Sequence, residues 1–498
     1  MPRQTTAYLP ELEWEGLQVP YTIALSGSAP HLPPGTLSLD LVRDERYRIK
    51  GTARGEIVSH YNSRGSTQAG DLASTISITV ADQRKGYRYE LEGYRGSYSE
   101  NYTVNERPHF TVDLILHRVR RRAWRYKSMQ PSTLVEWYLN GSRDLLIYGR
   151  SIVRKRVSRY SKQLMGSDRI YPTIPSSQEY HTGAALITWA DRCCVIQQVP
   201  PGCGPEWSES VGIEYRADWG GLPTPEERES IREIISFVIG RRLIHVGTTT
   251  FTKAGRVIEE ESIIPWGSNA PLVCQRSGLP PASLRRAAED VSLESVLQRL
   301  IPAYLTQRET LGLRGALWRY WIARESDVPE TALPIVAAGL EGIADRWIDS
   351  QRSETTKFYL SQERWKAITD PLFPTIRAQL AELSGEEALT EGGQKSIMSK
   401  LDNAYFLSGV NEKRRVFLTK LDLTIGKVEK KAFEARNKPA HGAQSDDFDE
   451  MIHNRNAYDT LFNRVILKIL GYDGTYTDRS ARGSPETPID QPLAGWSA

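Results

Sequence analysis

The spacing of apolar residues changes near residue 280, and this change constrains the fold of the 498-residue chain more than any other feature. Before it, short segments rich in Val, Ile, Tyr and Thr alternate with clusters of Gly, Pro, Asn and Ser, which is typical of strands and turns. After it, apolar residues recur at the spacing of an amphipathic helix. The sequence therefore predicts an α+β multidomain protein, with a β-rich N-terminal region followed by an all-helical bundle.

Residues 1–264 are expected to form this β-rich region, in one or two subdomains. A single helix is predicted inside it, with Thr224 as its N-cap, Pro225 in its first turn and Gly240 as its C-cap. The strands are expected at 37–42, 56–61, 75–81, 111–119, 145–153, 185–190 and 194–199, and a hairpin is expected from 242–251 and 256–264.

Residues 265–281 contain several Pro and Gly residues and are predicted to be a linker. Residues 282–476 are predicted to form the helical domain, and the tail 477–498, rich in Gly, Pro, Ser and Asp, is expected to be disordered. The helices are expected at 282–307, 309–324, 328–350, 360–383, 394–406, 411–436 and 446–470.

Composition argues against several classes of protein. The four cysteines include no pair with CxxC spacing, so no metal site of that kind is expected. The sequence has no phosphate-binding GxxxxGK[ST] motif, no HExxH and no GxSxG, and no cofactor is expected. No apolar run approaches the length of a signal peptide core or a membrane span, which predicts a cytoplasmic protein that does not bind membranes.

Two basic runs stand out against a net charge of only +3. Residues 117–127 and 150–162 each hold six Lys or Arg residues and no acid. Such runs usually form a solvated face; the alternative is a surface that binds RNA or phosphate. Trp124, Tyr126 and Tyr160 lie among the basic residues and favour the alternative slightly, because bases stack on aromatic rings.

The hexapeptide 436–441 (RNKPAH) is the candidate functional motif. Arginine can bind a phosphate through two hydrogen bonds, and histidine can move protons near neutral pH. Pro439 disfavours helical geometry at Lys438, so we expect the preceding helix to end or kink there and to expose Arg436. Arg436, Asn437 and His441 together suggest phosphodiester chemistry without a metal. The alternative is structural: Arg436 pairs with Glu434 or with an acid across the bundle, and His441 caps a helix.

The helical third of the chain resembles the HEPN superfamily, and most closely the ApeA-like anti-phage proteins. The segments that carry the resemblance are 313–324 (LRGALWRYWIAR), 335–343 (IVAAGLEGI), 435–442 (ARNKPAHG), 458–472 (YDTLFNRVILKILGY) and, before the helices, 235–251 (ISFVIGRRLIHVGTTTF). Ribonucleases of this superfamily carry an Arg, a polar residue, three variable residues and a His, which here are Arg436, Asn437 and His441.

The resemblance implies an RNA endonuclease of abortive infection that acts as a homodimer through the helical domain. It implies that cellular RNA such as tRNA is the substrate, and that a phage-derived trigger or another ligand of the N-terminal region releases the activity. His441 is expected to act as acid or base on the ribose 2′-hydroxyl, Arg436 to stabilise the phosphate, and Asn437 to orient the histidine or the substrate.

Other residues are expected to assist this site. Lys427, Lys431 and Lys438 lie in a segment, 411–438, with nine Lys or Arg residues and four acids, and are predicted to bind the RNA backbone. Glu341 is a candidate accessory residue that contacts Arg436 or Lys438; its alternative is a surface carboxylate. Among the histidines outside the motif, His453 is a weaker accessory candidate, and His117 and His245 are expected to be packed or exposed rather than catalytic.

Two further functions remain open at this point. A non-catalytic HEPN protein would bind nucleotides, RNA or a partner and regulate without cutting; the complete Arg–Asn–His set argues against it. In the third interpretation the β-rich half carries the main activity, as a carbohydrate or nucleic-acid binder, but no carboxylate pair or metal-ligand set there supports it.

Overall fold

The computed structural model divides into two compact units, Met1–Pro280 with Leu284–Pro302, and Pro281–Ser283 with Ala303–Ala498. The first is a β-rich sheet region and the second is largely helical, as the sequence predicted. The structure describes residues 7–9, 21–25, 32–58, 75–82, 85–102, 107–126, 128–142, 150–156, 160–165, 179–199, 204–265, 269–276, 278, 280–284, 292–350, 360–383, 389–405, 410–436 and 447–496.

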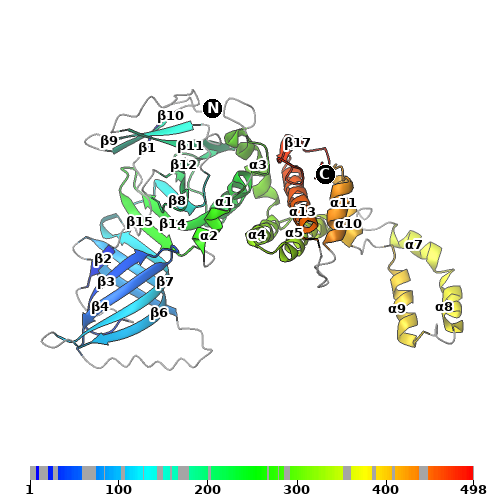
Figure 1. Ribbon diagram of the computed structural model, residues 1–498, viewed down its shortest axis with the longest axis horizontal. Coiled ribbons are helices and arrows are strands. Elements are labelled where there is room, and N and C mark those ends of the chain that lie inside the picture. The colour runs from blue at the N-terminus through cyan, green and yellow to red at the C-terminus, as the bar shows by residue number, and fades with distance from the viewer. Residues whose placement is uncertain are drawn as a thin grey trace. The chain divides into compact units, whose positions relative to one another are not determined.

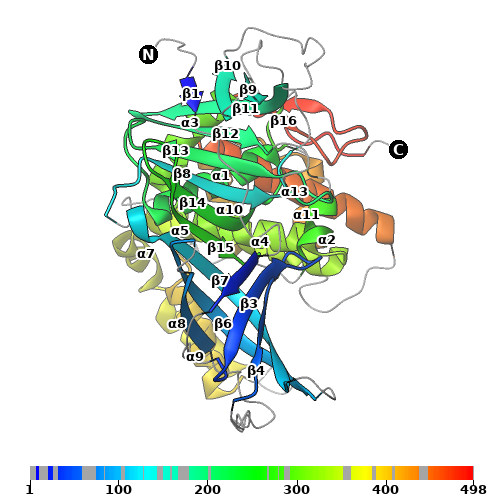
Figure 2. The ribbon, with the colours of Figure 1, turned by 90° about the vertical axis from the view of Figure 1, so that its left-hand side faces the viewer.

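The N-terminal unit is organised by one long strand, β7 (His109–Ala123), which belongs to two parts of a continuous sheet (Figures 1 and 2). On one side β7 pairs along its length with β6 (Tyr87–Asn101). On the other side, its first half pairs with β4 (Ile49–Glu56) and its second half with β15 (Val257–Ile263). Because β4 and β15 share one edge of β7, the sheet branches there.

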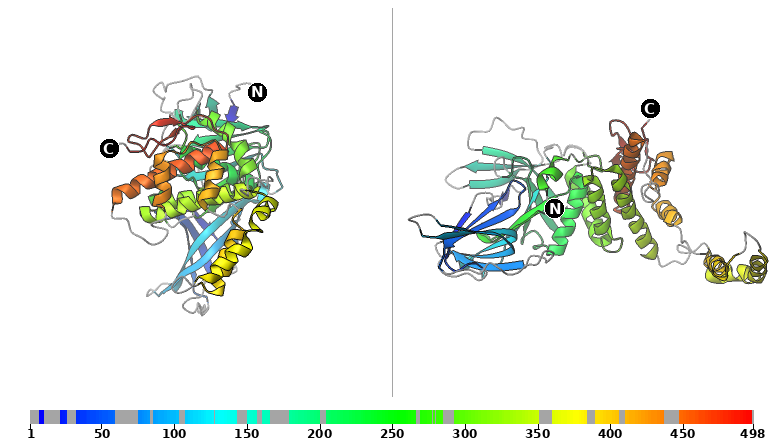
Figure 3. Two further views of the ribbon diagram at one scale, coloured as in Figure 1. Left: turned by 90° about the vertical axis from the view of Figure 1, so that its right-hand side faces the viewer. Right: turned by 60° about the horizontal axis from the view of Figure 1, so that its bottom comes forward.

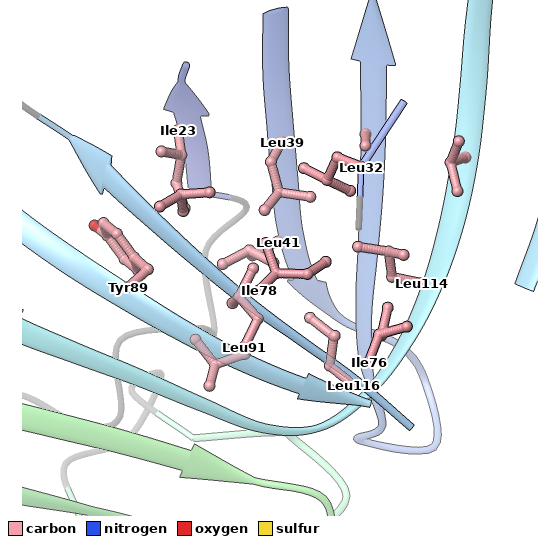
Figure 4. Close-up of a cluster of buried hydrophobic side chains, with 14 of the residues drawn as sticks. Ile23, Leu32, Leu39, Leu41, Ile76, Ile78, Tyr89, Leu91, Leu114 and Leu116 are labelled. Carbon is pink, nitrogen blue, oxygen red and sulfur yellow. The ribbon is translucent and has the colours of Figure 1, made fainter. Parts of the chain in front are cut away.

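The first branch is a curled sheet around its own core. It adds β2 (Tyr21–Ala24), β3 (Thr36–Arg43) and β5 (Thr75–Asp82) to β4, β6 and β7. The Tyr21 hydroxyl on β2 donates to Asp82 on β5 at 3.3 Å, so side chains join the two outer strands. Figure 4 shows the apolar side chains that these strands direct inward, among them Ile23, Leu41 and Leu91. Alternating burial along β3 and β7 gives the strands their buried and solvent faces.

The second branch continues from β15 through a long antiparallel series. Its order is β15, β14 (Ile244–Phe251), β8 (Thr133–Leu139), β13 (Val211–Arg216), β12 (Arg192–Gln198), β11 (Glu179–Trp189), β9 (Arg150–Arg156), β10 (Tyr160–Met165) and β1 (Ala7–Leu9). Helix α1 (Pro225–Ile239) forms where expected: Thr224 accepts a hydrogen bond from the Glu227 amide, and Gly240 ends the helix with φ of 71°.

Several strand predictions were right in position and others were wrong. Strands β3, β5, β7, β11, β12, β14 and β15 overlap the predicted segments. The strand predicted at 56–61 is wrong for residues 57 and 58, because β4 ends at Glu56; residues 59–61 lie outside the described residues. Strands β6, β8 and β13 were not predicted, and the predicted linker contains a short helix, α2 (Ala270–Gln275). Of the strand predicted at 145–153, the described part starts at Arg150, in β9.

In the helical unit, α5 (Pro329–Ser350) packs against α4 (Leu313–Glu325), α10 (Val410–Lys420) and α13 (Phe448–Ile469), and α11 (Lys427–Ala435) packs against α13 (Figure 3). Helix α3 (Leu293–Gln307) crosses the division between the units, after Pro302. The remaining described helices are α7 (Gln362–Thr369), α8 (Phe373–Glu382) and α9 (Glu391–Asp402), and α8 packs on α9. No helix within these described ranges has the length and apolar character needed to cross a membrane.

Two predicted helices are in fact pairs of helices. The one at 360–383 is divided into α7 and α8 around Pro371, which has no amide hydrogen to continue the hydrogen bonds of α7. The one at 411–436 is divided into α10 and α11; Asp422 adopts a left-handed φ of 54° between them, and Gly426 is the N-cap of α11. Helix α13 forms as predicted, but Asp447, not the predicted Ser445, caps its first turn; Ser445 lies outside the described residues.

The prediction of a disordered tail is wrong for residues 477–496. Strands β16 (Thr475–Thr477) and β17 (Glu486–Pro488) form a hairpin, and Ile489 and Leu493 are buried. The fully buried Arg464 donates to the Ile489 carbonyl at 2.9 Å and pairs with Glu429 at 2.9 Å. Composition identified the turns of this segment, but not the long-range polar contacts that fix it.

Candidate functional site

Arg436 lies at the C-terminal end of α11, where it is the C-cap residue with helical backbone angles. The helix ends before Pro439, in agreement with the expected stop near Lys438. The expectation that this would expose Arg436 is wrong, because its side chain is only 17% exposed. Asn437, Lys438, Pro439 and His441 lie outside the described residues.

Glu341, on α5, is the partner of Arg436. Its Oε1 atom lies 2.7 Å from Nη1 of Arg436, in ion-pair contact but without the alignment of a hydrogen bond. The carboxylate is 18% exposed. The predicted contact between these two residues is therefore present, and the alternative for Glu341, a surface carboxylate, is wrong. The structure does not test a catalytic role for either residue.

A second arginine, Arg414 on α10, approaches the same carboxylate. Its Nη1 atom is 4.0 Å from Oε1 of Glu341, and its side chain is 7% exposed. The guanidinium carbon lies 3.6 Å from the ring centroid of Phe433, and Nη2 donates to Asn411 Oδ1 at 2.7 Å. Arg414 is thus fixed by a ring, an amide and burial, whereas Arg436 stands at the end of its helix.

Burial dominates the electrostatics of this cluster. It raises the pKa of Glu341 above the ordinary value, while Arg436 and Arg414 act in the opposite direction. Burial likewise lowers the pKa of Arg414, although an arginine side chain remains charged near neutral pH. The Tyr458 hydroxyl lies beside Arg414 without a well-aligned hydrogen bond, and burial raises its pKa to about 12.

Counted over the described residues, the cluster carries more positive than negative charge. Two guanidinium groups face one carboxylate, and the neighbouring Lys413 and Asp345 neutralise each other at 3.0 Å. Nη1 of Arg414 and Nε of Arg436 are buried and have no hydrogen-bond partner among the residues that the structure describes. Unpaired buried donors are unfavourable, and an anionic acceptor would satisfy them.

Two of the three predicted RNA-binding lysines lie outside this cluster. Lys427 and Lys431 are exposed on α11, and Lys431 pairs with Glu450 at 2.8 Å. At 3.6 residues per turn, Lys431 and Arg436 are separated by roughly 140° around the helix axis. The third predicted lysine, Lys438, lies outside the described residues.

Of the other histidines, His245 is partly buried, with Nε2 2.9 Å from the Gly247 carbonyl oxygen, and burial lowers its pKa. His117 lies 3.6 Å from Glu92 on the curled sheet, and the ring of His453 stacks on Trp496 with centroids 5.0 Å apart. None of these three contacts the Glu341 cluster in the part of the chain that the structure describes.

The first basic run forms a neutralised ladder on β7 rather than an uncompensated positive surface. Arg120 contacts Glu261 at 2.8 Å, Glu259 at 3.2 Å and Glu90 at 3.7 Å. Arg122 pairs with Glu259 at 2.6 Å, Arg118 contacts Glu92 at 3.2 Å, and Arg121 pairs with Glu260. Because β6 and β15 flank β7, acids distant in sequence lie directly opposite the arginines. The second run forms β9 and β10, which pair with each other.

Arg414 is the residue of this site that the sequence did not single out. It is one of several basic residues on α10, and its position depends on how α10 packs on α5. The available signal was charge complementarity: adjacent basic residues Lys413 and Arg414 face Glu341 and Asp345, which are spaced by one helical turn. Comparison with known proteins adds no assignment: no family model, no curated protein and no solved structure matches this chain.

Proposed function

We propose that this chain is an RNA endonuclease of the HEPN type, which cleaves cellular RNA, tRNA among it, in defence against phage. His441 acts as acid or base on the ribose 2′-hydroxyl and the leaving 5′-oxygen, and Arg436 stabilises the charge that develops on the phosphate. Asn437 orients the histidine or the substrate. The attacking 2′-oxygen belongs to the RNA itself, so this chemistry requires no metal and leaves a 2′,3′-cyclic phosphate and a 5′-hydroxyl.

The observation that carries this proposal is the excess positive charge around Glu341. Pairing of Arg436 with an acid across the bundle is also what a purely structural role predicts. A structural pair, however, needs one arginine for one carboxylate, whereas Glu341 faces both Arg436 and Arg414. Maintaining an uncompensated charge at a largely buried place is costly. A phosphate diester supplies the missing negative charge, and the RNA backbone presents one at every nucleotide.

The assembly and control of the enzyme are part of the proposal. Two copies of the chain bring Arg436 and His441 of each subunit to one composite cleft, and the reaction takes place in the cytoplasm. The β-rich N-terminal unit restrains the nuclease until a phage-derived trigger or another ligand binds it. The resemblance to ApeA-like proteins supports this arrangement.

Cleavage of total cellular RNA and of purified tRNA by the full chain in EDTA tests the proposal. Wild type is compared with His441→Ala and Arg436→Ala. Loss of a positioned acid or base is expected to slow cleavage about 10²–10⁴-fold. The products should carry cyclic phosphate ends, which phosphatase does not remove until acid has opened the ring. His109→Ala, on β7, is the matched histidine control and should cleave like wild type.

If His441→Ala cleaves as fast as wild type, the assignment of the motif is wrong. If none of the proteins cleaves, the same three are compared in infected cells, where a trigger is present. RNA that is bound but intact under both conditions would identify the chain as a non-catalytic binding protein instead.

A further inference from the structure

The two arginines that face Glu341 differ in their freedom to move. Arg414 comes from α10, lies 3.6 Å over Phe433, donates to Asn411 and is 7% exposed. It is enclosed by protein and is not available to a macromolecular substrate. Arg436 is the C-cap residue of α11 and its Nη1 atom lies 2.7 Å from Glu341 Oε1. Of the two, only Arg436 stands at a helix end, from which its side chain can turn.

Binding of a phosphate by Arg436 creates a problem for Glu341. When the guanidinium turns toward the phosphate, the carboxylate loses its contact at 2.7 Å while it remains 18% exposed. An unpaired charge at such a position is strongly unfavourable, and this would oppose substrate binding. Arg414 Nη1 is 4.0 Å from the same oxygen atom and, within the described ranges, has no hydrogen-bond partner. A small movement of the Glu341 side chain would bring it into direct contact with Arg414.

We propose that Arg414 is a positioning residue that takes over the Glu341 carboxylate when Arg436 turns to the substrate phosphate. In the resting state Glu341 holds Arg436 within the bundle. In the bound state Glu341 pairs with Arg414, and the phosphate pairs with Arg436. The Glu341 carboxylate and the Arg436 guanidinium each keep a partner of opposite charge throughout, so the exchange makes Arg436 available at low cost. This inference rests on the proposed function, because it takes the ligand of Arg436 to be a phosphate of RNA.

Substitution of Arg414 and Glu341, singly and together, tests the exchange. Arg414→Met keeps an unbranched side chain but leaves Glu341 with Arg436 as its only cation, so RNA affinity and cleavage should fall roughly tenfold, the size of coupling seen between neighbours. Glu341→Gln removes the competing charge and should restore both in the double variant. Arg414→Lys should retain more activity than Arg414→Met. Arg415→Met, an exposed neighbour on α10, is the matched control and should not differ from wild type.

Two measurements separate this inference from the proposed function. One is cleavage; the other is the affinity for a short, fully 2′-O-methylated RNA, which lacks the attacking hydroxyl. Circular dichroism and thermal unfolding establish that each variant is folded. Rescue of Arg414→Met by Glu341→Gln is the diagnostic result, because a residue needed only for packing would not be rescued by altering a second packed residue.

The outcomes are distinct. If Arg436→Ala abolishes cleavage and Arg414→Met does not reduce it, the nuclease assignment stands and the exchange is wrong. If the affinities show the expected loss and rescue but no variant cleaves in infected cells either, the exchange stands and the nuclease assignment is wrong. If Arg414→Met is defective and Glu341→Gln does not restore it, or if wild type does not bind the methylated RNA, the exchange is overturned.

Discussion

The ladder on β7 and the cluster around Glu341 are both built from arginine and glutamate side chains, but the ratio of arginine to glutamate differs between them. On β7, Arg118, Arg120 and Arg122 face acids on both neighbouring strands, and the charges balance. In the helical unit, Arg414 and Arg436 face one carboxylate. The arginine-rich segment on β7 is thus neutralised by neighbouring acids. An excess of positive charge remains around Glu341, although the arginines there are not clustered in the sequence. Charge density along a chain therefore predicts local potential poorly; the acids that neighbouring elements supply decide it.

A buried ion pair, Glu429 with Arg464, is a third arrangement, in which one arginine faces one carboxylate. Its disruption is expected to cause the largest loss of stability. Glu429 and Arg464 are both fully buried and 2.9 Å apart. Glu429→Gln should lower the free energy of unfolding by about 3–5 kcal/mol, because it leaves Arg464 charged and buried. Urea denaturation monitored by circular dichroism measures it. Asp490→Asn, which breaks the exposed pair with Lys468, should cost about 1 kcal/mol or less. Equal losses would show that burial does not set the difference.

The next largest effect is expected on catalysis, from a change that keeps the charge of the Glu341 cluster. Arg436→Lys preserves the cation but not the planar, two-pronged donor. Loss of a preorganised donor to the developing charge should reduce the cleavage rate about 10²–10³-fold. The free energy of unfolding should change far less than in Glu429→Gln. A lysine variant that cleaves like wild type would mean that charge alone matters at this position.

The sequence predicted those parts of the fold that depend on local signals. Helix α1 was located by Thr224 and Gly240, and both caps are present. Strand β4 was missed because IKGTARGE contains two glycines and few β-branched residues; its pairing with β3 and β7 stabilises it as a strand. The break between α10 and α11 escaped prediction because Asp422, at φ of 54°, occupies a conformation that few non-glycine residues adopt.

The sequence predicted two residues of the site: one from the motif 436–441 and one from the polar face of the helix that became α5. Arg436 was selected for its neighbours in sequence, and Glu341 for its place on an otherwise apolar helix. Arg414 could not be selected in this way, because its role depends on the packing of α10 on α5 and on its contact with Phe433 of α11. The same reason explains the ladder: Glu90 and Glu259 are far apart in sequence, and only the pairing of β6 and β15 with β7 places both beside Arg120.

A partly buried histidine should make the stability of the N-terminal unit sensitive to pH. Burial lowers the pKa of His245 below its ordinary value of 6.5. The unfolded chain therefore binds the proton more readily, and the stability contributed by neutral His245 is lost as the pH falls from 6.5 toward the lowered pKa. Arginine and glutamate remain charged there.

The difference in unfolding free energy between wild type and His245→Gln, measured above and below pH 6.5, isolates this effect from that of other histidines. Wild type should lose more stability than the variant on acidification. A difference that does not change with pH, or that grows in favour of wild type at low pH, would contradict the assignment.

The smallest effect on stability is expected from the ladder itself, which gives the comparison its most direct test. Arg120 is 25% exposed, so Arg120→Gln should change the free energy of unfolding by about 0.2–1 kcal/mol and leave RNA affinity unchanged. Replacing Glu90 and Glu259 together by Gln removes the two acids that contact both Arg120 and Arg122, and leaves Glu261 as the remaining acid beside Arg120. This double variant should bind RNA more tightly than wild type, with a steeper dependence on salt.

If Arg120→Gln alone weakens RNA binding, the ladder is already a surface that binds RNA. If neither substitution alters RNA binding, the acids on the neighbouring strands are not what prevents this basic run from binding RNA. The contrast with the Glu341 cluster must then have another cause.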